Sequence, residues 1–138
     1  MEVSRRESVG AAPAVVWAFA IDVERWPAVM DHIDRIDRCD QGQFGLGSSA
    51  TLTQPGLPTT IWTVDRFISG ESFRWRGRPL GMAMTADHII RPSREGLTDL
   101  TLLVTASGWM AVLLGPVVRK AVERALVKEF SGFRMACE

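Results

Sequence analysis

The sequence predicts an α+β fold in which one long C-terminal helix covers the apolar face of an antiparallel sheet. Two observations lead to this prediction. The last thirty residues carry apolar side chains at three- and four-residue steps, the spacing of one helix face. Between residues 48 and 108, alternating apolar and polar residues are separated by turn-forming clusters, as in strands joined by tight turns. A sheet with one apolar face needs a cover, and no other predicted helix is long enough.

The N-terminal part of the chain predicts one strand and two short helices. Residues 2–10 alternate but contain few apolar positions, which is typical of an edge or half-exposed strand. A helix is expected from Pro13 to Ala20, because proline suits the first helical turn. A second short helical turn is expected at residues 23–27.

The middle of the chain predicts about six more antiparallel strands. Gly-, Pro- and Ser-containing stretches at residues 40–47, 55–58, 69–71 and 92–96 mark the turns between them. Phe73 and Trp75 alternate with Arg74 and Arg76, so the aromatic pair should face the core and the arginines solvent. The strands are expected around Ile33 and Ile36 and at residues 48–54, 59–68, 72–76, 82–90 and 97–108.

The terminal helix is expected after Gly115 and Pro116, which interrupt an apolar run that begins at Trp109. Its polar face is an ordinary solvated one, with charges of both signs. Its predicted apolar face consists of Val118, Val122, Leu126, Phe130 and Phe133.

Composition restricts the classes of function. A chain of 138 residues suits a single domain, residues 1–138, that buries a sizeable core. Sixteen basic and sixteen acidic residues cancel without a dense basic cluster, so nucleic acid is not an expected partner. The two cysteines, Cys39 and Cys137, are too far apart to indicate a metal knuckle or a disulfide framework. No cofactor and no metal are predicted.

Targeting signals are weak. Arg5 and Arg6 precede an apolar run that ends at Ala20, but Glu7 and Pro13 are out of place in a signal peptide. The apolar run at residues 109–118 is shorter than the roughly 20 residues of a membrane span. A cytoplasmic location without an integral membrane segment is expected.

Several stretches of the chain, in their order along it, carry a family resemblance: residues 12–19, 22–27, 62–64, 73–75, 88–92 and 96–98, and the helix after Gly115. Together they resemble the START-like (SRPBCC) helix-grip superfamily, in particular its polyketide cyclase/dehydrase and lipid-transport-like branch. The resemblance implies a curved sheet of about seven strands that wraps around the long helix, with a hydrophobic cavity between them. It also implies binding of apolar molecules such as lipids, sterols or polyketides, with catalysis in only some members. The resemblance extends over nearly the whole chain.

Inward-facing positions of the sheet supply the candidate ligand-binding residues. Met and Trp suit an adaptable apolar pocket, because Met repacks readily and Trp adds one N–H donor to a large apolar area. The alternative is that these side chains simply fill a core. The candidates are Trp62, whose orientation is uncertain, and Phe73, Trp75, Met84, His88, Leu102 and Val104.

His88 is the best candidate for proton chemistry, because it interrupts the apolar face of its strand and histidine is the residue type whose unperturbed pKa lies near neutrality. It would bind a ligand carbonyl or hydroxyl, or act as a base; the alternative is a buried neutral imidazole with an internal partner. His32 is expected in a surface loop.

Three functions are consistent with these features. The first is binding, and possibly transport, of a small apolar molecule such as a lipid, sterol or polyketide, with His88 and the Trp75 indole as polar anchors. The second is a polyketide aromatase, cyclase or dehydratase in which His88 takes a proton from the substrate. The third is a protein-interaction module of stress-response type.

Overall fold

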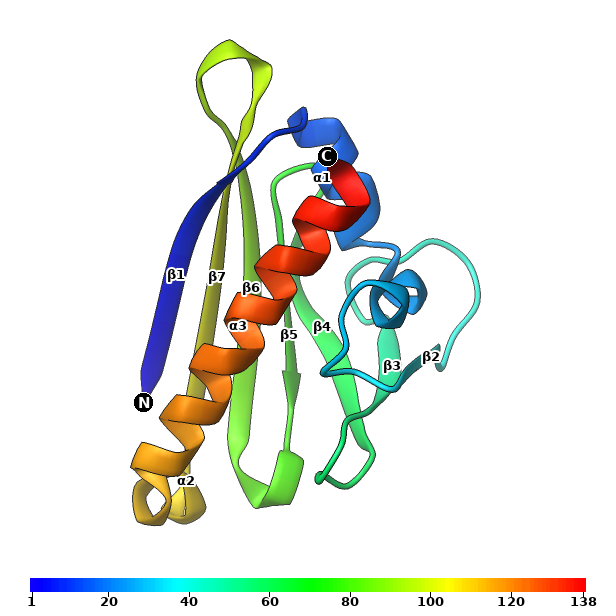
Figure 1. The fold of residues 1–138 in the computed structure, drawn as a ribbon. Helices are drawn as coiled ribbons and strands as arrows, with labels where there is room; N and C mark the ends of the chain where they lie inside the picture. The colour runs from blue at the N-terminus through cyan, green and yellow to red at the C-terminus, as the bar shows by residue number, and fades with distance from the viewer.

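The structure, a computed structural model, describes residues 1–138 and has the predicted α+β helix-grip architecture (Figure 1). Seven antiparallel strands form one open sheet in the order β1-β7-β6-β5-β4-β3-β2. The strands are β1 (Glu2–Val9), β2 (Arg35–Arg38), β3 (Ser49–Thr53), β4 (Thr60–Ile68), β5 (Ser72–Gly77), β6 (Ala83–Pro92) and β7 (Thr98–Ser107). The helices are α1 (Pro13–Ala20), α2 (Trp109–Leu113) and α3 (Gly115–Cys137), with 3₁₀ turns η1 (Val23–Ala28), η2 (Pro79–Gly81) and η3 (Arg94–Gly96).

Strand register places the predicted apolar positions on one face of the sheet. Phe73 on β5 lies opposite His88 on β6, which in turn lies opposite Leu102 on β7. All three side chains are buried. On β4, Trp62 is also buried, so the orientation that the sequence left uncertain is inward. Strand alternation therefore placed the inward face correctly.

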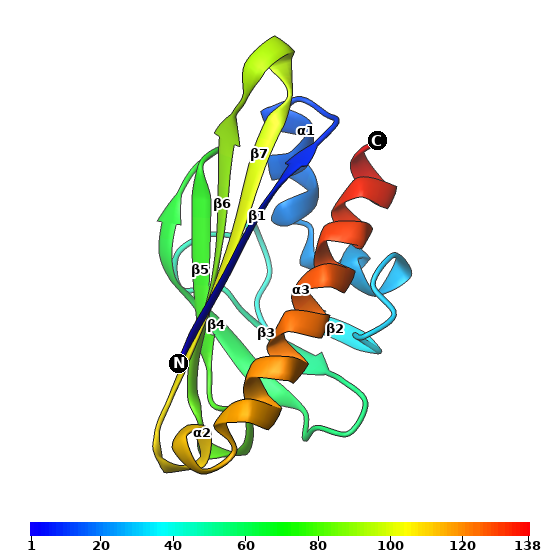
Figure 2. The same ribbon diagram turned by 60° about the vertical axis from the view of Figure 1, so that its left-hand side comes forward.

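The helix α3 lies across this inward face as a separate layer (Figures 1 and 2). The five apolar side chains that the three- and four-residue spacing selected are all buried, at exposed fractions of 9% or less. The interruption at Gly115 and Pro116 is confirmed, since α2 ends at Leu113 and α3 begins at Gly115. No helix of the structure is both long and apolar enough to cross a membrane.

The C-terminal end of α3 is held tightly against the neighbouring elements. Gly132 allows the closest approach, because a Cβ atom there would lie 2.6 Å from Cγ of Met30 and 3.0 Å from the carbonyl oxygen of Val29. On the other side, Arg134 forms an ion pair with Glu7 of β1. This half of the helix is thereby fixed to both the turn that follows η1 and the edge of the sheet.

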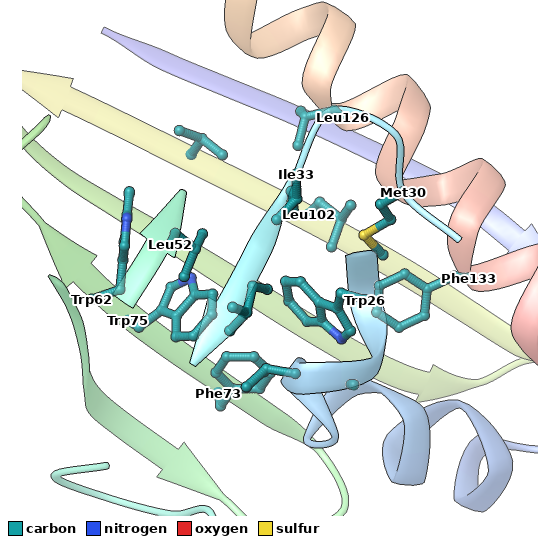
Figure 3. Close-up of a cluster of buried hydrophobic side chains, with 14 of the residues drawn as sticks. Trp26, Met30, Ile33, Leu52, Trp62, Phe73, Trp75, Leu102, Leu126 and Phe133 are labelled. Atoms are coloured by element: carbon teal, nitrogen blue, oxygen red, sulfur yellow. The ribbon is translucent and has the colours of Figure 1, made fainter. Parts of the chain in front are cut away.

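Aromatic side chains fill the same end of the space between helix and sheet (Figure 3). Trp26 of η1 is 1% exposed, and its indole N–H donates to the carbonyl oxygen of Phe19 at 3.2 Å. Its ring lies 5.6 Å from that of Trp75 and 6.1 Å from that of Phe133, measured between centroids. This packed end, where Trp26 contacts Phe133, therefore joins η1, the sheet and α3 in one core.

Candidate functional site

A cavity of about 300 Å³ remains between the sheet and the N-terminal half of α3. Of its 22 lining residues, 18 are hydrophobic, so the wall offers mainly dispersion contacts. Val118, Val122 and Leu126 form the helix side. Trp62, Trp75 and Met84 contribute to the opposite side from β4, β5 and β6.

The cavity includes four of the seven predicted ligand-binding residues. Trp62, Trp75, Met84 and Val104 lie on its wall. Phe73, His88 and Leu102 do not; they are 0%, 1% and 1% exposed and belong to the packed end. The reason is Trp26, a wall residue whose ring centroid lies 5.3 Å from that of His88 and 6.4 Å from that of Phe73.

The mouth of the cavity is apolar. Leu57, Leu80, Leu114 and Val117 line the cavity and are also exposed, which marks where it opens to solvent. Beside them, α2 presents Trp109, Val112 and Leu113 at exposed fractions of 73%, 83% and 66%. An apolar surface of this kind next to an apolar cavity is typical of a ligand-binding groove.

Glu129 is the functional candidate that sequence reasoning missed. It lies on the cavity wall, its side chain is 13% exposed, and its Oε1 is 3.4 Å from Nε2 of His88. The imidazole of His88 is stacked on Phe73 with ring centroids 4.4 Å apart. A signal was present in the sequence: Val122, Leu126, Glu129 and Phe133 follow steps of four, three and four, so Glu129 occupies an apolar-face position.

His32 corrects a sequence prediction, because it is half-buried on the cavity wall and not a surface-loop residue. It lies in the turn between η1 and β2, which passes close to α3. Burial lowers the pKa of its imidazole, aided by the nearby charge of Lys128 and opposed by Glu129 and Asp31.

Unpartnered polar atoms occur around the cavity. Nε1 of Trp62 and Nδ1 of His32, both in wall residues, are buried without a hydrogen-bond partner, and so is Nδ1 of His88 behind the wall. Buried polar groups normally have partners, so such atoms at a cavity indicate a place for a ligand or water. The Trp62 ring packs closely against Gly77 of β5, where a Cβ atom would lie 2.8 Å from the indole.

The outer face of the sheet is polar, as predicted for Arg74 and Arg76. Arg74 donates two hydrogen bonds to the carboxylate of Asp65, at 2.9 and 3.2 Å. These bonds raise the pKa of its guanidinium. Arg76 reaches the same carboxylate at 3.8 Å. These arginines therefore stabilise the outer surface and lie away from the cavity.

Other parts of the structure offer weaker candidates. No three His, Cys, Asp or Glu side chains come together in a way that would hold a metal ion. A second hollow, of about 500 Å³, lies by the turn between β6 and β7. It has only six lining residues, one of them hydrophobic, so it is a depression of the polar surface.

A family model described as polyketide cyclase / dehydrase and lipid transport matches residues 1–138. No curated protein matches the chain in sequence. A hypothetical protein from Helicobacter pylori has a similar structure, with a TM-score of 0.84 at 13% identity over 100% of this chain and 88% of its own. The Zhui aromatase/cyclase from Streptomyces sp. R1128 gives 0.78 at 16% identity, covering 99% and 93%. A protein from Thermus thermophilus, TTHA0849, gives 0.76 at 16% identity, covering 99% and 96%. At these identities the structural likeness establishes the fold.

Proposed function

Because the chain belongs to the polyketide cyclase/dehydrase and lipid transport family, we propose that it binds a small apolar molecule in the cavity beneath α3. Binding would involve Trp62, Trp75, Met84 and Val104 on the sheet side of the wall. Phe73, His88 and Leu102, which the sequence also suggested, would support this wall from behind.

The observation that carries this proposal is the composition and size of the cavity. Its volume of about 300 Å³ is at the lower end of the range for small-molecule sites, about 300–1,000 Å³. Eighteen hydrophobic residues in the wall leave few partners for water. An apolar molecule gains dispersion contacts there and loses little hydration, so occupancy by such a molecule is favourable.

The first test is to identify what the protein carries. Protein purified from its native host or from a lipid-rich extract is denatured, and the organic-soluble fraction is examined by mass spectrometry. A stoichiometric apolar molecule is expected, and adding it back should raise Tm by mass action. An empty fraction, together with no Tm shift across panels of polyketides, sterols and fatty acids, would contradict the proposal.

A matched pair of variants assigns the binding to the cavity. Ala125 is half-buried on the cavity wall, so Ala125→Phe places a ring inside the space that the ligand would use. Because the ligand must displace that ring, binding should weaken by about tenfold to a hundredfold in a titration. Ala136 lies on the same helix, exposed and outside the wall. Ala136→Phe should bind as the native protein does; equal loss in both variants would place the site elsewhere.

A second candidate function is conversion of a cavity-bound polyketone, as an aromatase/cyclase or dehydratase. The pairing of Glu129 with His88 favours it, because a carboxylate and an imidazole in contact can accept and return a proton. Glu129 would contact the substrate and take the proton from a methylene next to a carbonyl, while His88 would position it. The Zhui aromatase/cyclase shares the fold.

Turnover separates this candidate from simple binding. A linear poly-β-ketone thioester is incubated with the native protein and with Glu129→Gln, and products are followed by liquid chromatography. An enzyme should lose about a hundredfold in turnover in the variant while still binding the substrate. Absence of any product with the native protein would leave binding as the function.

A further inference from the structure

We propose that the cavity selects apolar molecules that carry a hydroxyl group and rejects those that carry a carboxylate, because Glu129 supplies the only acidic side chain in its wall. This inference rests on the proposed binding function and adds the chemical class of the ligand. It assigns Glu129 as the residue that determines specificity.

The inventory of polar groups in the wall is short. Apart from Glu129 and the indole N–H groups of its tryptophans, only His32 and Gln54 have polar side-chain atoms; no Lys, Arg, Ser or Thr is present. Burial lowers the pKa of His32, which favours its neutral form at pH 7. The wall therefore has no cation to pair with an anionic ligand.

Glu129 has little internal compensation for its charge. The only ion-pairing side chain within 4.0 Å of its carboxylate is His88, and that contact is a long one of 3.4 Å to Oε1. The neighbouring Lys128 pairs instead with Asp31, at 3.0 Å. No other side chain of the protein donates a hydrogen bond to Glu129, which is part of the wall, so its carboxylate retains capacity as an acceptor.

A hydroxyl group matches this environment. It donates to the carboxylate, and a hydrogen bond to a charged acceptor is among the stronger ones in proteins. A ligand carboxylate would instead lie near a like charge in a poorly hydrated space, without a cation to offset its desolvation. An ammonium group could donate as well, but it would add a second ion that must lose its water, whereas a hydroxyl group makes the same contact uncharged.

The opposite side of the wall provides a complementary donor. Nε1 of Trp62 is buried and unpartnered, and the side chain is 7% exposed. It suits a carbonyl or ether oxygen on the ligand, and a single neutral donor does not compensate for a full negative charge. A hydroxylated ring system with one such oxygen offers a partner to each of these two polar groups.

Three bicyclic probes test the inference: 2-naphthol, 2-methylnaphthalene and 2-naphthoate, titrated at pH 7 into the native protein and into variants of Glu129. In Glu129→Leu, the affinity for 2-naphthol relative to 2-methylnaphthalene should fall about tenfold, because the acceptor is lost. In Glu129→Gln, 2-naphthoate should bind about tenfold tighter than to the native protein, because the like charge is removed. The nearly isosteric Gln variant keeps the test valid if the Leu variant fails to fold.

A control on the same helix removes an equal charge elsewhere. Glu123 is paired only with Arg119, and its side chain is 52% exposed. Glu123→Leu and Glu123→Gln should leave all three affinities unchanged. Two outcomes would contradict the inference and leave the binding function in place. In the first, the probes bind but the affinity for 2-naphthol relative to 2-methylnaphthalene is unchanged in Glu129→Leu. In the second, 2-naphthoate binds the native protein as tightly as 2-naphthol does. If no probe binds the native protein at any concentration, the cavity-binding function itself fails.

Discussion

His32 lies half-buried on the cavity wall beside Glu129, and burial lowers its pKa below the ordinary value of 6.5. Above that value both the folded and the unfolded chain hold a neutral imidazole. As pH falls below it, the unfolded chain binds the proton first, so the free energy of unfolding decreases. Between about pH 7.5 and 5.5 the native protein should therefore lose more Tm than His32→Gln, as measured by circular dichroism. Parallel Tm curves for the two proteins would contradict this.

Individual side chains show where sequence reasoning succeeded and where it stopped. Strand alternation was sufficient to place Trp75 and Met84 on the inward face. It could not separate cavity from core, because that depends on Trp26 from η1 covering His88 and Phe73. The sequence does show Glu129 as a charged residue at an apolar-face position. Its contact with His88, which lies on a strand 41 residues earlier in the chain, is created only by the fold.

Within α3, two glycines should respond oppositely to the same substitution. Alanine is normally the better helix former, by about 0.5–1 kcal/mol. At Gly132, however, the added methyl group would overlap Met30 and the backbone of Val29, so Gly132→Ala should destabilise the protein by about 1–3 kcal/mol. A Cβ atom added at Gly115 would meet no atom within 4 Å beyond its own stretch of the helix, so Gly115→Ala should be neutral or slightly stabilising. Urea denaturation measures the stability of both variants; equal stability would show that the turn carrying Val29 and Met30 moves freely away from α3.

Element boundaries followed the local signals closely. Predicted strands at 48–54, 72–76 and 82–90 correspond to β3, β5 and β6 within about two residues, and the Gly115–Pro116 interruption separates α2 from α3. Proline and glycine act through the local backbone, so their effect is readable from sequence. The close contact of Gly132 with Met30 is different in kind, because it arises from two elements meeting in space.

Across the whole molecule, α3 is packed unevenly, and its backbone should reflect this. Its C-terminal half buries Phe130 and Phe133, with Phe133 against Trp26 and Phe19, whereas residues 117–129 include the helix side of the cavity. Amide hydrogens in residues 117–126 should therefore exchange faster than those in 130–136. Peptide-resolved hydrogen exchange should also show slowing at 117–126 when a ligand binds. If exchange were uniform along α3 and unchanged by ligand, the cavity would not lower the local stability of the helix.

The overall arrangement was predictable because the two-residue periodicity of the strands and the helical periodicity of the C-terminal segment each indicate an apolar face that must be covered. A seven-stranded sheet with one apolar face and a helix with an apolar face at Val118, Val122, Leu126, Phe130 and Phe133 form one covered core. The volume left between them was not predictable, since it is the small difference between the space that the curved sheet encloses and the side chains that enter it.

The positions of the tryptophans make the intrinsic fluorescence of the protein sensitive to the contents of the cavity. There is no tyrosine, so the intrinsic fluorescence comes almost entirely from five indoles. Three of them, Trp26, Trp62 and Trp75, line the cavity, and Trp109 stands exposed beside its mouth. A molecule that enters changes the surroundings of the first three, while a water-soluble quencher reaches mainly the fourth. With Trp109 replaced by phenylalanine, unlabelled protein would report the occupancy of the cavity through its own fluorescence.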